Sequence, residues 1–180
     1  MKRILLSVVI LSFFLSLGAV YHKVGDFEPG SPYYSVDVVG TTAYVVDPFI
    51  TGLQIIDVSN PLSPVRLGSL TTSGSAYSII MVGTTAYVAD GYAGLQIINV
   101  SNPQSPMLLG HCNTPGFASS VDVEGTIAFV ADYYTGLQII DVSNPQSPVI
   151  LGSYVTPANA RSVDVVGTTA FVADSEAGLQ

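Results

Sequence analysis

Short apolar runs separated by turn-forming residues dominate the pattern of this sequence. A representative stretch has apolar runs at Ser35–Val39, Ala43–Val46 and Leu53–Val58, and a fourth run begins near Pro64. Runs this short, bounded by Gly, Asn, Ser and Pro, predict β-strands. Because the runs are apolar at consecutive positions, we expect sheets that are covered on both faces. Outside the N-terminal segment, no stretch shows helical periodicity of useful length.

The same unit of four runs recurs every 42 residues. Equivalent glycines of the unit are Gly52, Gly94, Gly136 and Gly178. Four-stranded sheets at a repeat of about 40 to 45 residues are typical of the blades of a β-propeller. The spacing therefore predicts an all-β chain, a propeller of four-stranded antiparallel blades.

The ends of the repeat region predict an incomplete propeller. His22–Phe27 aligns with the fourth strand of a unit, whereas the last repeat stops at Gln180, inside a third strand. An open arc would leave two apolar faces in water, at an upper bound of roughly 15–30 kcal/mol per face. We therefore expect a fragment of a longer propeller, with a four-bladed ring closed by the N-terminal strand as the alternative. The expected segments are a signal peptide at 1–18, an N-terminal outer strand completing another blade at 19–34, blade 1 at 35–76, blade 2 at 77–118, blade 3 at 119–160 and a partial blade 4 at 161–180.

The N-terminus and the composition indicate where the protein is located and which partners it can have. Residues 1–18 join a basic start to an apolar run and end in small residues, the pattern of a secretory signal peptide. We expect secretion or display at the cell surface, with no transmembrane segment in the mature chain. The formal charge of -8 makes nucleic acid an unsuitable partner. The single cysteine excludes an intrachain disulfide.

The repeat also resembles a known family. Leu53–Asp57, Leu95–Asn99 and Leu137–Asp141 each follow a glycine and precede Val-Ser-Asn-Pro, which is similar to the LVIVD repeat family. The resemblance extends from about Val24 to the end and implies a β-propeller of bacterial or archaeal secreted and cell-surface proteins. It brings no catalytic motif. Asn99 departs from the family's aspartate.

Two sets of repeated aspartates are candidate sites. Asp47, Asp90, Asp132 and Asp174 end the second strands, where they form the following turn or bind calcium; we favour the turn. Asp37, Asp122 and Asp164 lie within the first strands, where they line a central channel as a functional acidic site or are simply solvated; we favour the second reading. We expect no metal site and no cofactor.

Aromatic residues gather in the loops after the second strands. Phe49, Tyr92, Tyr133 and Tyr134 occupy these loops and are the candidate binding residues for a protein or a carbohydrate at the rim. Their alternative role is ordinary loop packing. The neighbouring His111 and Cys112 do not form a catalytic pair, because adjacent strand residues point to opposite faces; Cys112 is expected in the core.

The leading prediction for function is a non-catalytic interaction scaffold, not an enzyme. One alternative is a propeller-based hydrolase or lyase whose site lies in a missing part. Near-identical blades disfavour it, because repetition creates rings of like residues rather than the unlike groups of an active site. The other alternative is a purely structural spacer within a large surface protein.

Overall fold

The computed structural model describes residues 32–49 and 52–180, which form an all-β chain of four antiparallel sheets. The first sheet holds β1 (Ser35–Val39), β2 (Thr42–Asp47), β3 (Gly52–Asp57) and β4 (Val65–Leu70). The second holds β5 (Ser78–Val82), β6 (Thr85–Ala89), β7 (Leu95–Asn99) and β8 (Met107–Cys112). The third holds β9 (Ser120–Glu124), β10 (Ile127–Ala131), β11 (Leu137–Asp141) and β12 (Val149–Tyr154). The fourth holds β13 (Ala160–Val166), β14 (Thr169–Asp174) and β15 (Gly178–Leu179), with a 3₁₀ turn, η1 (Ser175–Ala177), before β15.

The strands of each sheet follow one another in chain order. The β1–β2 register runs from Ser35 opposite Val46 to Val39 opposite Thr42, and the connecting turn needs Gly40, whose φ is +62°. The all-β prediction and the four-stranded antiparallel unit are thus confirmed for three sheets, and the fourth has three strands. The predicted signal peptide and most of the N-terminal outer strand, His22 included, lie outside the described residues. No helix in the described part is long and apolar enough to cross a membrane.

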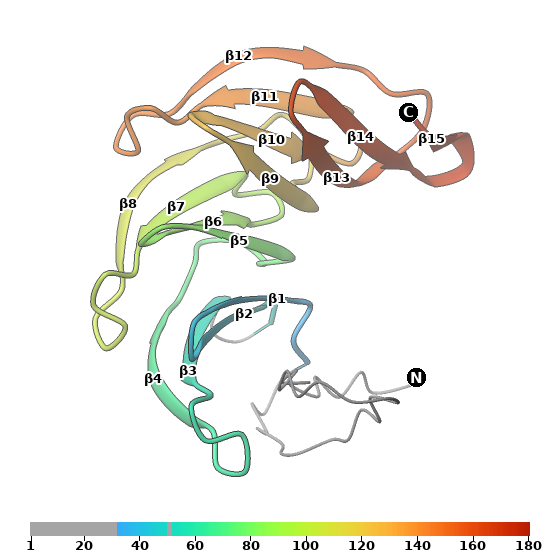
Figure 1. Cartoon of the computed structure of the whole chain (residues 1–180). Helices are drawn as coiled ribbons and strands as arrows, with labels where there is room; N and C mark the ends of the chain where they lie inside the picture. Colours follow the sequence, from blue (N-terminus) through green and yellow to red (C-terminus); the bar gives the residue numbers. More distant parts are fainter. Residues whose placement is uncertain (1–31, 50–51) are drawn as a thin grey trace.

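The four sheets are arranged in an arc, with β1, β5, β9 and β13 on its inner side (Figure 1). β1, β5 and β9 each contact the inner strand of the following sheet. The fourth strands, β4, β8 and β12, lie on the outer side (Figure 1). The described residues therefore show blade-like units side by side in an arc that is open between the first and the last sheet.

Three apolar layers hold neighbouring sheets together. Leu53 and Ile55 of the first sheet pack with Ile79 and Val88 of the second. The other face of the second sheet packs on the third in the same way, and the third packs on the fourth. This arrangement explains why the strands are apolar on both faces: an inner sheet has a neighbour on each side.

Each four-stranded sheet also carries a β-bulge between its third and fourth strands. In the first sheet, Gly68 pairs with Ile55 but Arg66 pairs with Ile56, so Leu67 is the extra residue. The second and third sheets repeat the shift between Ile97 and Ile98 and between Ile139 and Ile140. A bulge bends and twists its strand, here at the outer strand of every complete sheet.

The bulged strand brings a glycine against the next sheet. A Cβ added to Gly68 would overlap the carbonyl oxygen of Pro103, and one added to Gly110 would overlap that of Pro145. Gly152, at the same position of the third sheet, has nothing within 4 Å of such a Cβ. The glycine is therefore a steric requirement only where an Asn-Pro turn of the following sheet covers it.

This difference gives a matched pair of substitutions. Gly110→Ala should lower the free energy of unfolding by about 1–3 kcal/mol, because the Pro145 carbonyl or the strand must move. Gly152→Ala should be neutral or slightly stabilising, by up to about 1 kcal/mol, because it restricts only the unfolded chain. Urea denaturation of both variants measures the difference. Equal losses of stability would contradict this account of packing between sheets.

Candidate functional site

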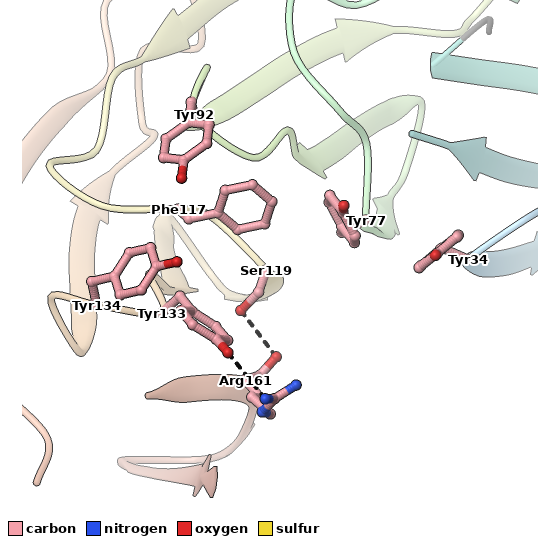
Figure 2. Close-up of a pocket in the computed structure, with 8 residues that line it drawn as sticks. All are labelled: Tyr34, Tyr77, Tyr92, Phe117, Ser119, Tyr133, Tyr134 and Arg161. Atoms are coloured by element: carbon pink, nitrogen blue, oxygen red, sulfur yellow. Dashed lines mark hydrogen bonds between the residues drawn. The ribbon is translucent and has the colours of Figure 1, made fainter. Parts of the chain in front are cut away.

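Aromatic side chains of the first three sheets and their connecting segments, together with Arg161 of the fourth sheet, line a cavity. Its volume is about 370 Å³. We call this cavity the aromatic trough. Its lining residues are Tyr34, Tyr77, Tyr92, Phe117, Ser119, Tyr133, Tyr134 and Arg161 (Figure 2).

Equivalent positions of the repeat supply most of the trough. One position of the repeat is occupied by Tyr34, Tyr77, Ser119 and Arg161; it immediately precedes the inner strand in the first three sheets and is the second residue of β13 in the fourth. The loops between second and third strands supply the rest, apart from Phe117. These loops are fixed to the next sheet by paired backbone hydrogen bonds, between Gly91 and Ala118 and between Tyr133 and Ala160. The fold thus holds the loop of one sheet beside the entry to the inner strand of the next.

The rings contact one another edge to face. Tyr34 and Tyr77 have centroids 5.1 Å apart, and Tyr77 and Phe117 5.0 Å. Phe117 lies 4.9 Å from Tyr92. Tyr133 lies 6.4 Å from Phe117 and 4.7 Å from Tyr134. Edge-to-face pairs at these distances are favourable by roughly 0.5–1.5 kcal/mol each beyond the area they bury, so the rings form a mutually supported wall.

Tyr133 adopts a backbone conformation that bulky residues rarely take. Its φ is +43°, in the left-handed region, where the equivalent residue of the second sheet is Gly91. A Cβ at Gly91 would come within 3.1 Å of the Phe117 ring. Holding a non-glycine residue in this region costs of order 1–3 kcal/mol, and such strain clusters at functional sites. The structure therefore keeps the Tyr133 ring in the trough at a cost in stability.

Arg161 closes one side of the trough in a fixed position. Its Nε donates a hydrogen bond to Ser175 Oγ at 2.8 Å, and an Nη donates to the Tyr133 hydroxyl at 3.0 Å. Its guanidinium carbon lies 5.1 Å from the Tyr133 ring centroid, within cation–π range. Ser119 Oγ lies 3.0 Å from the Arg161 carbonyl oxygen (Figure 2). Among the described residues that line the trough, Arg161 is the only charged one, and it is already partnered.

The remaining lining groups are the Phe117 ring, five tyrosines and the Ser119 hydroxyl. Tyr34, Tyr92 and Tyr134 are largely exposed. The Tyr92 phenol beside Tyr134 raises the pKa of the Tyr134 hydroxyl above its ordinary value. The trough can therefore offer ring surfaces for apolar contact and several hydroxyl groups that both donate and accept hydrogen bonds.

The structure brings together most of the aromatic residues that the sequence singled out. Tyr92, Tyr133 and Tyr134 line the trough. Phe49 lies at its edge, 6.1 Å from Tyr34 between ring centroids. Sequence reasoning missed Tyr34, Tyr77, Ser119 and Arg161, although they share one position of the repeat, and it also missed Phe117.

The inner-strand aspartates connect neighbouring sheets. Asp37 Oδ2 accepts a hydrogen bond from the Met81 backbone N–H at 2.7 Å, and Asp122 Oδ2 accepts one from Val165 N–H at 2.6 Å. Their other oxygens accept from Val38 and Val123. Asp164 is exposed on the last sheet. Asp37 and Asp122 thus act as links between inner strands, a role that neither the channel-site nor the solvated reading foresaw.

Comparison with known proteins agrees with the repeated architecture. The model of the LVIVD repeat matches four consecutive segments, residues 34–72, 73–114, 115–156 and 157–180. The chain belongs to the LVIVD repeat family. No curated protein matches it.

Solved structures resemble this LVIVD repeat protein at low sequence identity. The computationally designed Ika4 protein has a TM-score of 0.70 at 7% identity, over 85% of this chain and 91% of that one. The computationally designed Ika8 protein has a TM-score of 0.71 at 7% identity, over 88% of this chain and 48% of that one. A functionally unknown protein from Desulfotomaculum acetoxidans has a TM-score of 0.71 at 16% identity, over 86% of this chain and 52% of that one. The LVIVD chain thus spans about half the length of the last two, and the likeness concerns the fold alone.

The aspartates that end the second strands hold the segment arriving from the previous sheet. Asp90 accepts hydrogen bonds from the Thr72 hydroxyl at 2.7 Å and from Gly74 N–H at 2.8 Å. Asp132 accepts the equivalent pair of hydrogen bonds from the Thr114 hydroxyl and Gly116 N–H. We call this pair of hydrogen bonds to the aspartate the latch. Asp47 accepts a hydrogen bond from Phe49 N–H at 3.0 Å, which is the local turn that the sequence predicts.

The latch is weaker in the fourth sheet of this LVIVD repeat protein. Asp174 Oδ2 accepts from Ala158 N–H at 2.8 Å, but its buried Oδ1 has no hydrogen-bond partner. Thr156, which corresponds to Thr72, donates to the Ala158 carbonyl oxygen instead. The favoured turn reading is therefore too narrow: in Asp90, Asp132 and Asp174 the side chain binds a segment 16 residues earlier in the chain.

Other reactive side chains are placed as expected. Cys112 is buried in the core between the second and third sheets, and burial raises the pKa of its thiol, whereas His111 is exposed. Across 32–49 and 52–180, no three His, Cys, Asp or Glu residues come together as a potential metal site. The substitution of Asn99 for the family aspartate preserves the local contact. Asn99 Oδ1 accepts from Ser101 N–H at 2.9 Å, as Asp57 does from Ser59 at 2.8 Å.

The Asp90 latch predicts a pH dependence of stability. Burial raises the pKa of Asp90 above its ordinary 3.8, despite the hydrogen bonds from Thr72 and Gly74. Between pH 3.8 and the higher native pKa, the folded state therefore keeps a proton that the unfolded state has released. The contribution of Asp90 to stability is present below pH 3.8 and is lost as pH rises through the native pKa. The stability of the native protein relative to its Asp90→Asn variant should fall over that window, in urea denaturations between about pH 3 and about pH 7.

Asp57 provides a control of opposite sign. Hydrogen bonds from Ser59 lower the Asp57 pKa, so its contribution to stability is present above 3.8 and is lost as pH falls through the lower native value. Asp57→Asn should therefore give the reverse trend. A pH-independent difference for Asp90→Asn would show that the buried carboxyl group does not titrate as described.

Proposed function

We propose that this LVIVD repeat protein is an exported, non-catalytic scaffold of the β-propeller type that binds carbohydrate in its aromatic trough. The observation that carries the proposal is the wall of edge-to-face rings around the cavity of about 370 Å³, with the Tyr133 ring held in it by a left-handed backbone. A cavity of this size lies within the range of small-ligand sites, roughly 300–1,000 Å³.

A sugar suits the chemistry of the trough better than a charged ligand. Sugar rings present C–H groups on their faces and hydroxyls at their edges. The exposed rings of Tyr34, Tyr92 and Tyr134 can contact the first, and the phenol hydroxyls can hydrogen-bond the second. The Arg161 guanidinium is already hydrogen-bonded to Tyr133 and Ser175, so it stabilises the wall of the trough rather than binding an anionic ligand.

Differences between sheets favour a binding protein over a uniform spacer. One position of the repeat, at the start of the inner strands, carries Tyr34, Tyr77, Ser119 and Arg161, while the strands themselves are nearly identical. A spacer needs only the packing layers, which do not require an aromatic residue at the left-handed turn position that Tyr133 shares with Gly91 of the second sheet and Ser175 of the fourth. The variation lies where a ligand would contact the protein.

The lining of the trough also favours binding without hydrolysis. Glycoside hydrolysis generally uses two carboxyl groups on either side of the scissile bond. The eight residues that line the trough in the described part of the chain are six aromatic residues, a serine and an arginine. This set can hold a sugar in place but offers neither of the acid–base groups that such a reaction uses.

Export is the part of the proposal that depends on residues 1–18. Expression of the full chain in a bacterial host with a general secretion pathway should yield a protein that begins at Ala19 or Val20, because small residues stand at the cleavage positions. N-terminal sequencing of the exported product measures this. An uncleaved chain retained in the cytoplasm would contradict the assignment.

Binding is tested with immobilised neutral polysaccharides such as β-glucan, xylan, mannan and chitin. We expect the full chain to bind at least one of them. Tyr92→Ala or Tyr134→Ala should weaken binding by about 5- to 30-fold, the equivalent of roughly 1–2 kcal/mol for one lost ring contact. Affinity electrophoresis or calorimetry measures the change.

Tyr154→Ala is the matched control, because Tyr154 is similarly exposed but lies on β12 and does not line the trough. It should bind as the native protein does. Equal weakening by all three substitutions, or no binding to any of the polysaccharides, would contradict the proposal. A fall in polysaccharide chain length during incubation would contradict its non-catalytic part.

A further inference from the structure

The rings of the aromatic trough form an extended row rather than a compact cluster. Between ring centroids, Tyr34 lies 5.1 Å from Tyr77, and Tyr77 lies 5.0 Å from Phe117. Phe117 is followed by Tyr133 at 6.4 Å, and Tyr133 by Tyr134 at 4.7 Å. Figure 2 shows Tyr34 and Tyr134 at opposite ends of this row. The trough therefore extends from the first sheet to the loop of the third.

The two ends of the row offer exposed ring surface. Tyr34 is 53% exposed at one end, and Tyr134 is 62% exposed at the other. Tyr77, Phe117 and Tyr133 lie between them and are half-buried. A single sugar residue that contacts one exposed ring therefore does not reach the other ring. Only a ligand made of several linked residues contacts both ends.

The polar groups of the trough gather around Arg161, away from Tyr34 (Figure 2). The guanidinium donates to Ser175 Oγ and to the Tyr133 hydroxyl, and both of these residues have left-handed backbones, with φ of +39° and +43°. Within residues 32–49 and 52–180, they are the only non-glycine residues with a positive φ. Such conformations are strained, so two strained turns hold one guanidinium in place.

The position of this guanidinium suits a neutral hydrogen-bonding ligand. Arg161 is exposed and lines the trough. A guanidinium has five N–H donors in a rigid plane, and the bonds to Ser175 and Tyr133 use only part of this set. The remaining donors can bind the hydroxyl oxygens of a sugar without any rearrangement of the side chain.

We propose that the aromatic trough contains two subsites and that its ligand is a linear neutral oligosaccharide long enough to occupy both. This inference rests on the carbohydrate binding proposed above. One sugar residue lies at the polar subsite, formed by Arg161, Tyr133 and Tyr134, where it accepts hydrogen bonds from the guanidinium. A sugar residue further along the same ligand contacts the aromatic subsite, formed by Tyr34 and Tyr77.

Two subsites joined by one ligand give a characteristic dependence of affinity on ligand length. A ligand that is too short to reach both subsites binds only at the polar one. Once the ligand spans them, the second contact is intramolecular and adds affinity without a second encounter. Hydrogen bonds from Met81 N–H to Asp37 and between Gly91 and Ala118 fix the relative positions of the first three sheets. The affinity should therefore rise in a step at one ligand length.

Titration calorimetry of the full chain with oligosaccharides of increasing length tests the proposal. The probes are the linear series from monosaccharide to hexasaccharide derived from β-glucan, xylan, mannan and chitin. In the series that binds, we expect the hexasaccharide to bind about 5- to 30-fold more tightly than the disaccharide, which is the gain from one added ring contact.

Three variants assign this gain to the two subsites. Tyr34→Ala should remove the gain with length and leave the affinity for the disaccharide unchanged, because Tyr34 belongs to the aromatic subsite alone. Arg161→Gln should weaken binding of the disaccharide and the hexasaccharide by a similar factor, because both ligands occupy the polar subsite. Tyr154→Ala is the control outside the trough and should show the native dependence on length.

The outcomes separate this inference from the proposed function. Equal affinity for the disaccharide and the hexasaccharide would overturn the two subsites and leave carbohydrate binding intact. The same holds if Tyr34→Ala keeps the gain with length or weakens both ligands equally, or if Arg161→Gln binds as the native protein does. If no member of any series bound, the proposed function would fail and this inference with it.

Discussion

Neighbouring sheets of this LVIVD repeat protein are joined by side chains that satisfy backbone groups of the next sheet. Asp37 and Asp122 each bind one N–H of their own strand and one of the following inner strand. The buried Asp90 and Asp132 bind the segment that leads into their own sheet. Buried polar groups are costly unless they are hydrogen-bonded, so these contacts fix the relative position of sheets that apolar packing alone would allow to slide.

The aromatic trough depends on that fixed position. Its wall alternates residues from the loop of one sheet with residues from the inner-strand entry of the next, as with Tyr92, Phe117 and Tyr133. A small rotation between sheets would separate rings whose centroids lie about 5 Å apart. The latches thus make a continuous surface from short loops, none of which could form a site alone.

Much of this fold follows from the sequence, because period, strand length and apolarity on both faces are local signals. The strand bounds differ from expectation by a residue or two. What sequence reasoning missed depends on contacts between sheets. Asp90 has a turn-forming type at a turn position, yet its carboxylate reaches Gly74 in the preceding segment. The left-handed φ of Tyr133 and the gathering of Tyr34, Tyr77 and Arg161 into one wall require the placement of one sheet beside another. Tyr34, Tyr77 and Arg161 share one position of the repeat, and that shared position was the sequence signal that could have identified them.

The span of the latches has a consequence for exchange of repeats between proteins. Asp90 is 16 residues beyond Gly74 and 18 beyond Thr72, so the group it organises crosses the boundary between two sheets. The family repeat 73–114 begins within this group, between its two donors. A unit transplanted with cuts at the strand ends would keep its aspartate and lose the donors. A transplanted unit that begins before Thr72 would keep both donors together with the aspartate that binds them. The connector together with the following sheet is therefore the smallest interchangeable module.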